Sequence, residues 1–192
     1  LTYLCFNERV IWLLTKEQAK DFLLDRTNPT RFIENKVKIS HPSLGILPFN
    51  LYKFQKGIVN RFISDHNLIM LKSRQVGAST IAQAIALWSA IHFEDYKILI
   101  ISAGQRNAKS FLNKIKNMFD NLPDYLKEEL RFIDDETSIN KGRLVNNKFE
   151  MHFSNGSSIT ALPATESASR GESINLLIID EAAFIERVEE VY

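Results

Sequence analysis

The sequence lacks disulfide partners, membrane-length apolar runs and an obvious leader. A single cysteine, Cys5, excludes an internal disulfide and is typical of a protein from a reducing compartment. No stretch approaches the roughly eighteen consecutive apolar residues that a membrane-spanning helix needs. The start, Leu1-Thr2-Tyr3, has neither an initiator methionine nor the features of a signal peptide. We therefore expect a piece of a longer protein that does not enter a membrane.

A basic excess is also missing. The 24 basic and 23 acidic residues give a net charge of +1, whereas a dedicated nucleic-acid binder usually carries a clear positive excess. Any contact with DNA is expected to be local, transient or made by another part of the protein. The four histidines have no cysteine or carboxylate at metal-ligand spacing, so we expect them to be structural or surface residues.

The N-terminal quarter of the sequence lacks the alternating strand and helix pattern of the rest. Thr15 followed by Gln18 resembles a capping box and predicts a helix from Lys16 to about Leu24, which Thr27-Asn28-Pro29 ends. We predict an N-terminal lead-in segment over residues 1–47 and a core domain over residues 48–192.

From Phe49 onwards the pattern predicts alternating strands and helices. Apolar runs predict strands at 66–71, 97–101 and 175–179, and helical spacing predicts helices at 81–91 and through Phe111, Ile115, Met118 and Leu122. Asn155-Gly156 between two further strands predicts a hairpin with a type I′ turn. The sequence therefore predicts an α/β fold, in which helices flank a mostly parallel sheet with a β-hairpin insertion.

A candidate phosphate loop runs from Lys72 to Thr80, between a predicted strand and a predicted helix. Such a loop needs a tight turn whose backbone N–H groups and helix N-terminus hold phosphate oxygens. Gly77 suits the turn, and the hydroxyl of Ser79 suits a magnesium ion. The alternative is an ordinary strand-to-helix turn with a glycine and a polar cap.

The loop departs from the pattern G-x-x-x-x-G-K-[ST] at two positions. Lys72 stands at the first glycine position and Ala78 stands at the lysine position. Phosphate charge must still be balanced, and Lys72 and Arg74 are the cations within the loop. We predict that Lys72 replaces the lysine that is missing at Ala78.

A second motif ends the apolar run 176–179 with Asp180 and Glu181. In a P-loop enzyme the first carboxylate holds magnesium, and the second can act as a general base toward the attacking water. The two motifs in this order, with a helix and strand between them, predict an ATPase with a P-loop NTPase fold.

The same segments resemble the ATPase domain of the large terminase subunit, the DNA-packaging motor of tailed bacteriophages. Ser73-Arg74-Gln75-Val76-Gly77 resembles the deviant Walker A motif of that family, and Leu51-Tyr52-Lys53-Phe54-Gln55 resembles its adenine motif. Ser169-Arg170-Gly171 and the segment 180–185 resemble the region around Walker B. The resemblance covers residues 48–185 and implies an ASCE-type P-loop fold.

The resemblance also implies individual roles. Gln55 would bond the adenine edge with Tyr52 or Phe54 stacked nearby, Arg74 would face the phosphates, and Arg170 would reach the γ-phosphate of a neighbouring subunit. The predicted catalytic residues are Glu181, Arg170 and Arg74, and the predicted magnesium residues are Ser79 and Asp180. The predicted nucleotide-binding residues are Gln55, Tyr52, Lys72, Ser73, Arg74, Gln75, Val76, Gly77, Ala78, Ser79 and Thr80.

The function that the resemblance implies is ATP hydrolysis, with Mg²⁺, that drives viral double-stranded DNA into a procapsid in the host cytoplasm. The implied partners are DNA, the portal protein, the small terminase subunit and further copies in a ring, with the isolated fragment a monomer. The coupling motif after Walker B and the nuclease domain of the family have no match within these 192 residues. The alternatives are a helicase or translocase of another family, and a nucleotide-binding module that no longer hydrolyses, which Ala78 suggests.

Overall fold

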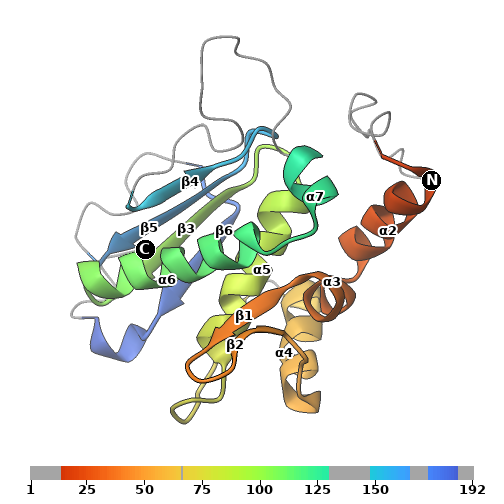
Figure 1. The fold of residues 1–192 in the computed structure, drawn as a ribbon. Helices are drawn as coiled ribbons and strands as arrows, with labels where there is room; N and C mark the ends of the chain where they lie inside the picture. Colours follow the sequence, from red (N-terminus) through yellow and green to blue (C-terminus); the bar gives the residue numbers. More distant parts are fainter. Residues whose placement is uncertain (1–13, 66, 130–147, 165–172, 186–192) are drawn as a thin grey trace.

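The computed structural model describes residues 14–65, 67–129, 148–164 and 173–185 (Figure 1). In chain order its elements are α2 (Lys16–Thr27), α3 (Pro29–Lys36), β1 (Lys38–His41), β2 (Gly45–Pro48), α4 (Lys53–Ser64), α5 (Ala78–His92), β3 (Lys97–Ser102), α6 (Gln105–Asp120), α7 (Asp124–Glu129), β4 (Glu150–His152), β5 (Ser158–Pro163), β6 (Leu176–Asp180) and a 3₁₀ turn, η1 (Ala182–Phe184). None of the described helices is long and apolar enough to cross a membrane.

The main sheet has the order β4-β5-β3-β6. β3 pairs in parallel with both β5 and β6, and β4 pairs antiparallel with β5. The predicted α/β fold with a mostly parallel sheet and a hairpin is therefore confirmed. Because parallel strands end at one edge of a sheet, this topology places the end of β6 beside the end of β3, where Ser102 and Asp180 are register partners.

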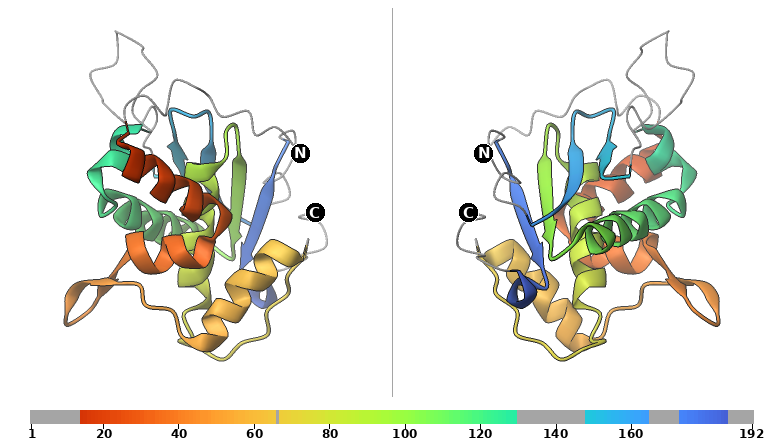
Figure 2. Two further views of the ribbon diagram at one scale, coloured as in Figure 1. Left: turned by 90° about the vertical axis from the view of Figure 1, so that its right-hand side faces the viewer. Right: turned by 90° about the vertical axis from the view of Figure 1, so that its left-hand side faces the viewer.

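The two faces of the sheet carry separate apolar clusters because side chains alternate along each strand. α5 and α6 pack on one face, where residues such as Ile98 and Ile100 join them in the large core cluster (Figures 1 and 2). Leu99 and Ile101 point to the other face and form a smaller cluster with Ile185. α5 is almost wholly buried, so the position of its first turn is fixed by the core.

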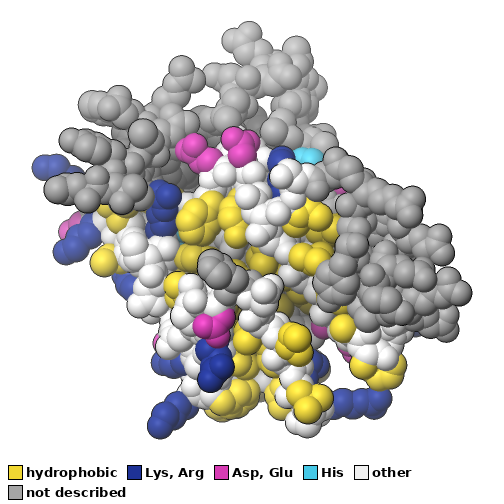
Figure 3. Space-filling model, turned by 180° about the vertical axis from the view of Figure 1, so that it is seen from behind, with side chains coloured by type: hydrophobic (Ala, Val, Ile, Leu, Met, Phe, Trp, Pro, Cys, Tyr) yellow, Lys and Arg dark blue, Asp and Glu magenta, His cyan; other side chains and the backbone are white. Residues whose placement is uncertain are grey.

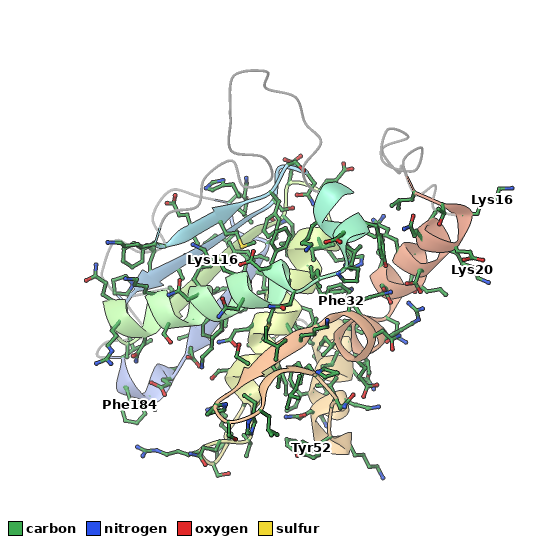
Figure 4. The ribbon with its side chains drawn as sticks, viewed as in Figure 1. Lys16, Lys20, Phe32, Tyr52, Lys116 and Phe184 are labelled. Carbon is green, nitrogen blue, oxygen red and sulfur yellow. The ribbon has the colours of Figure 1, made fainter. Side chains whose placement is uncertain are left out.

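The N-terminal segment contains more structure than its sequence suggests. The capping box is present, with Thr15 N–H donating to Gln18 Oε1 at 2.8 Å, and α2 extends to Thr27. The mixed segment after it forms α3 and the β1–β2 hairpin, which extends away from the main sheet (Figure 2). Phe32 of α3, labelled in Figure 4, joins the same core as α5. The boundary at residue 47 stays a prediction.

Two local predictions are wrong. No strand forms over residues 67–71, where Ile69 and Leu71 are fully exposed at 98% and 102%. An apolar run forms a strand only when it pairs with a neighbour, and none of the described strands pairs with this segment. The predicted hairpin is present as β4–β5, but the predicted turn type is wrong. A type I′ turn needs a positive φ at both central residues, and within this turn only Gly156 has one. The Asn155 side chain instead donates to the carbonyls of Ala90 and Phe93 at the end of α5.

His92 joins the N-terminal helices to the end of α5. Its buried ring stacks on Phe22 at 4.8 Å and meets Phe32 edge-on at 5.0 Å. Nδ1 donates to the Trp88 carbonyl, whereas Nε2 is buried with no partner among the described residues. Burial lowers the pKa of His92 from 6.5 to about 4, so the folded protein holds the ring neutral.

A pH-dependent loss of stability follows from His92. The unfolded chain takes up this proton near pH 6.5, so the stabilisation is present above that pH and is lost as the pH falls toward about 4. We expect the free energy of unfolding to fall by about 3 kcal/mol over this range, relative to a His92→Phe variant. Denaturant unfolding of both proteins at several pH values measures the difference, and parallel pH profiles would contradict it.

Candidate nucleotide-binding site

A hydrogen bond joins the two predicted magnesium residues. Ser79 lies in the first turn of α5, and Asp180 is the last residue of β6. Ser79 Oγ donates to Asp180 Oδ1 at 2.8 Å, across 101 positions of sequence. The fold therefore brings a hydroxyl and a carboxylate from the two predicted motifs into direct contact.

The loop before α5 is irregular and ends in a left-handed glycine. Gly77 has a φ of +77° and caps α5, whose first N–H groups have no acceptor within the helix. Gln75 is also left-handed, with a φ of 63°. These backbone conformations form a tight turn that leads directly into a helix N-terminus. This is the local geometry that anion-binding loops use.

The side chains of the loop divide into exposed and enclosed groups. Lys72, Ser73, Arg74 and Gln75 are exposed, Val76, Gly77, Ser79 and Thr80 are half-buried, and Ala78 is buried. Within the described part of the chain, neither Lys72 nor Arg74 has an ion-pair partner, so both cations remain available to an anion. Whether Lys72 takes the role of the missing lysine stays a prediction.

Glu181 follows β6 in an exposed position. Its backbone is left-handed, with a φ of 59°, and it caps the 3₁₀ turn η1. Asn107, in the first turn of α6, places Nδ2 at 3.5 Å from Glu181 Oε2. The sequence interpretation missed Asn107. Its position shortly after a buried parallel strand was the available signal, because such strands end at the same edge as β6.

The predicted adenine motif begins α4 and reaches the loop through Gln55. Gln55 is only 4% exposed, and its Oε1 accepts a hydrogen bond from Tyr52 N–H at 2.9 Å. Its Nε2 donates to the Val76 carbonyl at 3.1 Å. The amide of Gln55 therefore contacts the protein backbone at both ends.

An exposed aromatic pair lies beside these contacts. The Tyr52 and Phe54 rings are nearly parallel, with centroids 6.0 Å apart, and their residues are 69% and 53% exposed. Figure 4 places Tyr52 at the lower edge of the molecule, and Figure 3 shows hydrophobic and basic side chains along that edge. A planar ligand would find an open stacking surface there.

One predicted site residue cannot be placed. Arg170 and the segment Ser169-Arg170-Gly171 lie outside the described residues. The predicted role of Arg170 toward a neighbouring subunit therefore stays a prediction.

Two comparisons with known proteins bear on the family and the fold of this chain. A family model described as "Terminase large subunit, T4likevirus-type, N-terminal" matches residues 69–192. The fold is similar to the crystal structure of the HK97 bacteriophage large terminase, with a TM-score of 0.58 and 20% sequence identity. That match covers 82% of this chain and 31% of the HK97 chain, so this chain spans about a third of that protein. Because the family match takes in well over half of its residues, the chain belongs to the large terminase subunit family.

Proposed function

We propose that this chain is the ATP-hydrolysing motor part of a large terminase subunit, and that hydrolysis drives viral double-stranded DNA into a procapsid. Membership of the large terminase family supports a packaging role over a helicase of another family. The main support for ATP hydrolysis is the hydrogen bond between Ser79 and Asp180, because it joins the candidate phosphate loop to the acidic end of β6.

The residues at this junction fit a magnesium ion. Mg²⁺ prefers oxygen ligands and binds through one or two carboxylates together with substrate phosphates. Ser79 Oγ and Asp180 Oδ1 are adjacent oxygens of this kind. When bound, the ion would offset the negative charge of the phosphates. Asp180 would anchor it from the sheet, and Ser79 would anchor it from the helix.

The remaining groups each suit one task in binding or hydrolysis. The left-handed turn at Gly77 leads the backbone N–H groups of α5 toward a phosphate. Lys72 and Arg74 supply positive charge from the exposed side of the loop. Glu181, one residue beyond Asp180, accepts a proton from the attacking water as general base. Tyr52 and Phe54 offer a surface for the base.

The wider assembly is part of the same proposal. The proposed partners are viral DNA, the portal protein, the small terminase subunit and further copies of the chain in a ring, in the host cytoplasm. The net charge of +1 supports only a local DNA contact within this part of the protein. Arg170 would act on the nucleotide of a neighbouring subunit in that ring.

Magnesium dependence tests the hydrolytic proposal. We expect phosphate release from ATP in Mg²⁺ and none after chelation. Ser79→Ala should lower turnover roughly tenfold or more, because it removes the hydroxyl that bonds Asp180 and would help to hold the magnesium ion. Ser110→Ala, at an exposed serine of α6, is the matched control and should not change turnover. Equal phosphate release with and without Mg²⁺, or no release in either, would refute the proposal.

A further inference from the structure

We propose that Gln55 is a positioning residue that holds the phosphate loop in its binding conformation. The binding of a polyphosphate without a base should therefore depend on Gln55. The inference rests on the proposed nucleotide site, but it goes beyond the adenine contact that the sequence resemblance implies. Three observations on Gln55 carry it: its burial, its two hydrogen bonds and its close packing against Gly77.

The first observation is that the amide of Gln55 is enclosed. The residue is 4% exposed, and its two polar ends bind backbone groups on two different segments, Tyr52 at the start of α4 and Val76 in the loop. In this structure the side chain of Gln55 therefore links the start of α4 to the loop through two hydrogen bonds.

The second observation concerns the peptide that Gln55 holds. Its Nε2 donates to the carbonyl of Val76, which belongs to the peptide between Val76 and Gly77. In a planar trans peptide the N–H points opposite to the C=O. Holding the Val76 carbonyl toward Gln55 thus directs the Gly77 N–H away from Gln55. Gly77 is the cap of α5, so this N–H adds to the donors of the helix N-terminus.

The third observation is the close approach of Gly77. A Cβ built at Gly77 would lie 2.7 Å from Gln55 Nε2, so that any larger residue would displace the amide or the turn. Gly77 also has a φ of +77°, which side-chain-bearing residues rarely adopt. Gly77 and Gln55 therefore pack directly against each other, and the conformation of the loop depends on both residues.

Inorganic tripolyphosphate separates this role from base recognition, because it has the phosphates of ATP and no base. We expect Gln55→Met, which keeps the length of the side chain without a donor, to raise the dissociation constant for Mg²⁺-tripolyphosphate roughly tenfold. Gln55→Glu keeps the acceptor for Tyr52 N–H but turns an oxygen toward the Val76 carbonyl, and should weaken binding at least as much. The ratio of ATP to tripolyphosphate affinity should stay at its wild-type value.

The control is Asn60→Asp, which makes the same amide-to-acid change at an exposed position of α4. Thermal unfolding midpoints confirm that each variant is folded, and Gln55→Met carries the test if Gln55→Glu unfolds. The ¹⁵N-glycine amide signal of Gly77 supplies a second readout. It should shift in ligand-free Gln55→Met, whereas the signal of Gly104 should not.

The outcomes are distinct. Normal tripolyphosphate binding in Gln55→Met, with only the preference for ATP over GTP lost, would overturn the inference and assign Gln55 to the base. An unshifted Gly77 signal together with normal tripolyphosphate binding would do the same. If the wild-type protein binds neither ATP nor tripolyphosphate, the proposed function itself fails, and the inference fails with it.

Discussion

Replacing Glu181 with glutamine is expected to lower ATP turnover by ~10² or more while ATP binding is retained. Glutamine has the shape of glutamate but cannot take a proton from water. Glu181 is exposed at the end of β6, next to the carboxylate that bonds Ser79, so it can approach water at the proposed magnesium site. A loss in turnover without a loss in binding is the signature of a general base.

The Glu181 experiment combines single-turnover phosphate release with equilibrium ATP binding. Glu94→Gln is the matched control, since Glu94 is exposed in the turn between α5 and β3. We expect it to leave turnover unchanged. Turnover of Glu181→Gln within a few-fold of wild type would remove this residue from the catalytic role. No turnover in the wild-type protein, with intact ATP binding, would instead favour a module that has lost hydrolysis.

Asp180→Asn is expected to weaken both magnesium-dependent ATP binding and turnover, with a loss in kcat/KM on the order of 10²-fold or more. The substitution removes the negative charge from the proposed ion but keeps an oxygen that can accept the Ser79 hydroxyl. Binding and turnover should fall together, unlike in Glu181→Gln. The Mg²⁺ concentration that gives half-maximal turnover should rise.

The matched control for Asp180→Asn is Asp65→Asn. Asp65 is an exposed carboxylate that also accepts a serine hydroxyl, from Ser64 at 2.9 Å, but it lies at the end of α4. We expect no change in the magnesium dependence of that variant. An Asp180→Asn protein whose magnesium titration overlays that of the wild type would show that the ion binds elsewhere.

The sequence predicted the α/β fold well because its helices and strands follow local apolar patterns. The apolar runs that became β3 and β6 are parallel strands, and the sheet topology then brings Asp180 beside the loop. The resemblance to the large terminase subunit, which rested on the same motifs, is confirmed by the family match.

The errors come from features that a local pattern does not encode. The run 67–71 is as apolar as β3, but a strand also requires a partner edge, which the sequence does not specify. α3 was missed although Asn28 and Pro29 are a typical helix start, with Asn28 Oδ1 accepting from Arg31 N–H at 3.0 Å. The hydrogen bond of Gln55 to the Val76 carbonyl and the contact of Asn107 with Glu181 depend on tertiary neighbours, so only the structure reveals them.

Calorimetric titration of ATP into Glu181→Gln, with and without Mg²⁺, tests the central claim most directly, because this variant should bind without turnover. We predict a single site whose affinity requires Mg²⁺ and is clearly weakened when Asp180→Asn is added to the same protein. Binding that is equally strong without Mg²⁺, or unaffected by Asp180→Asn, would contradict the claim that the loop and the end of β6 form one magnesium-nucleotide site.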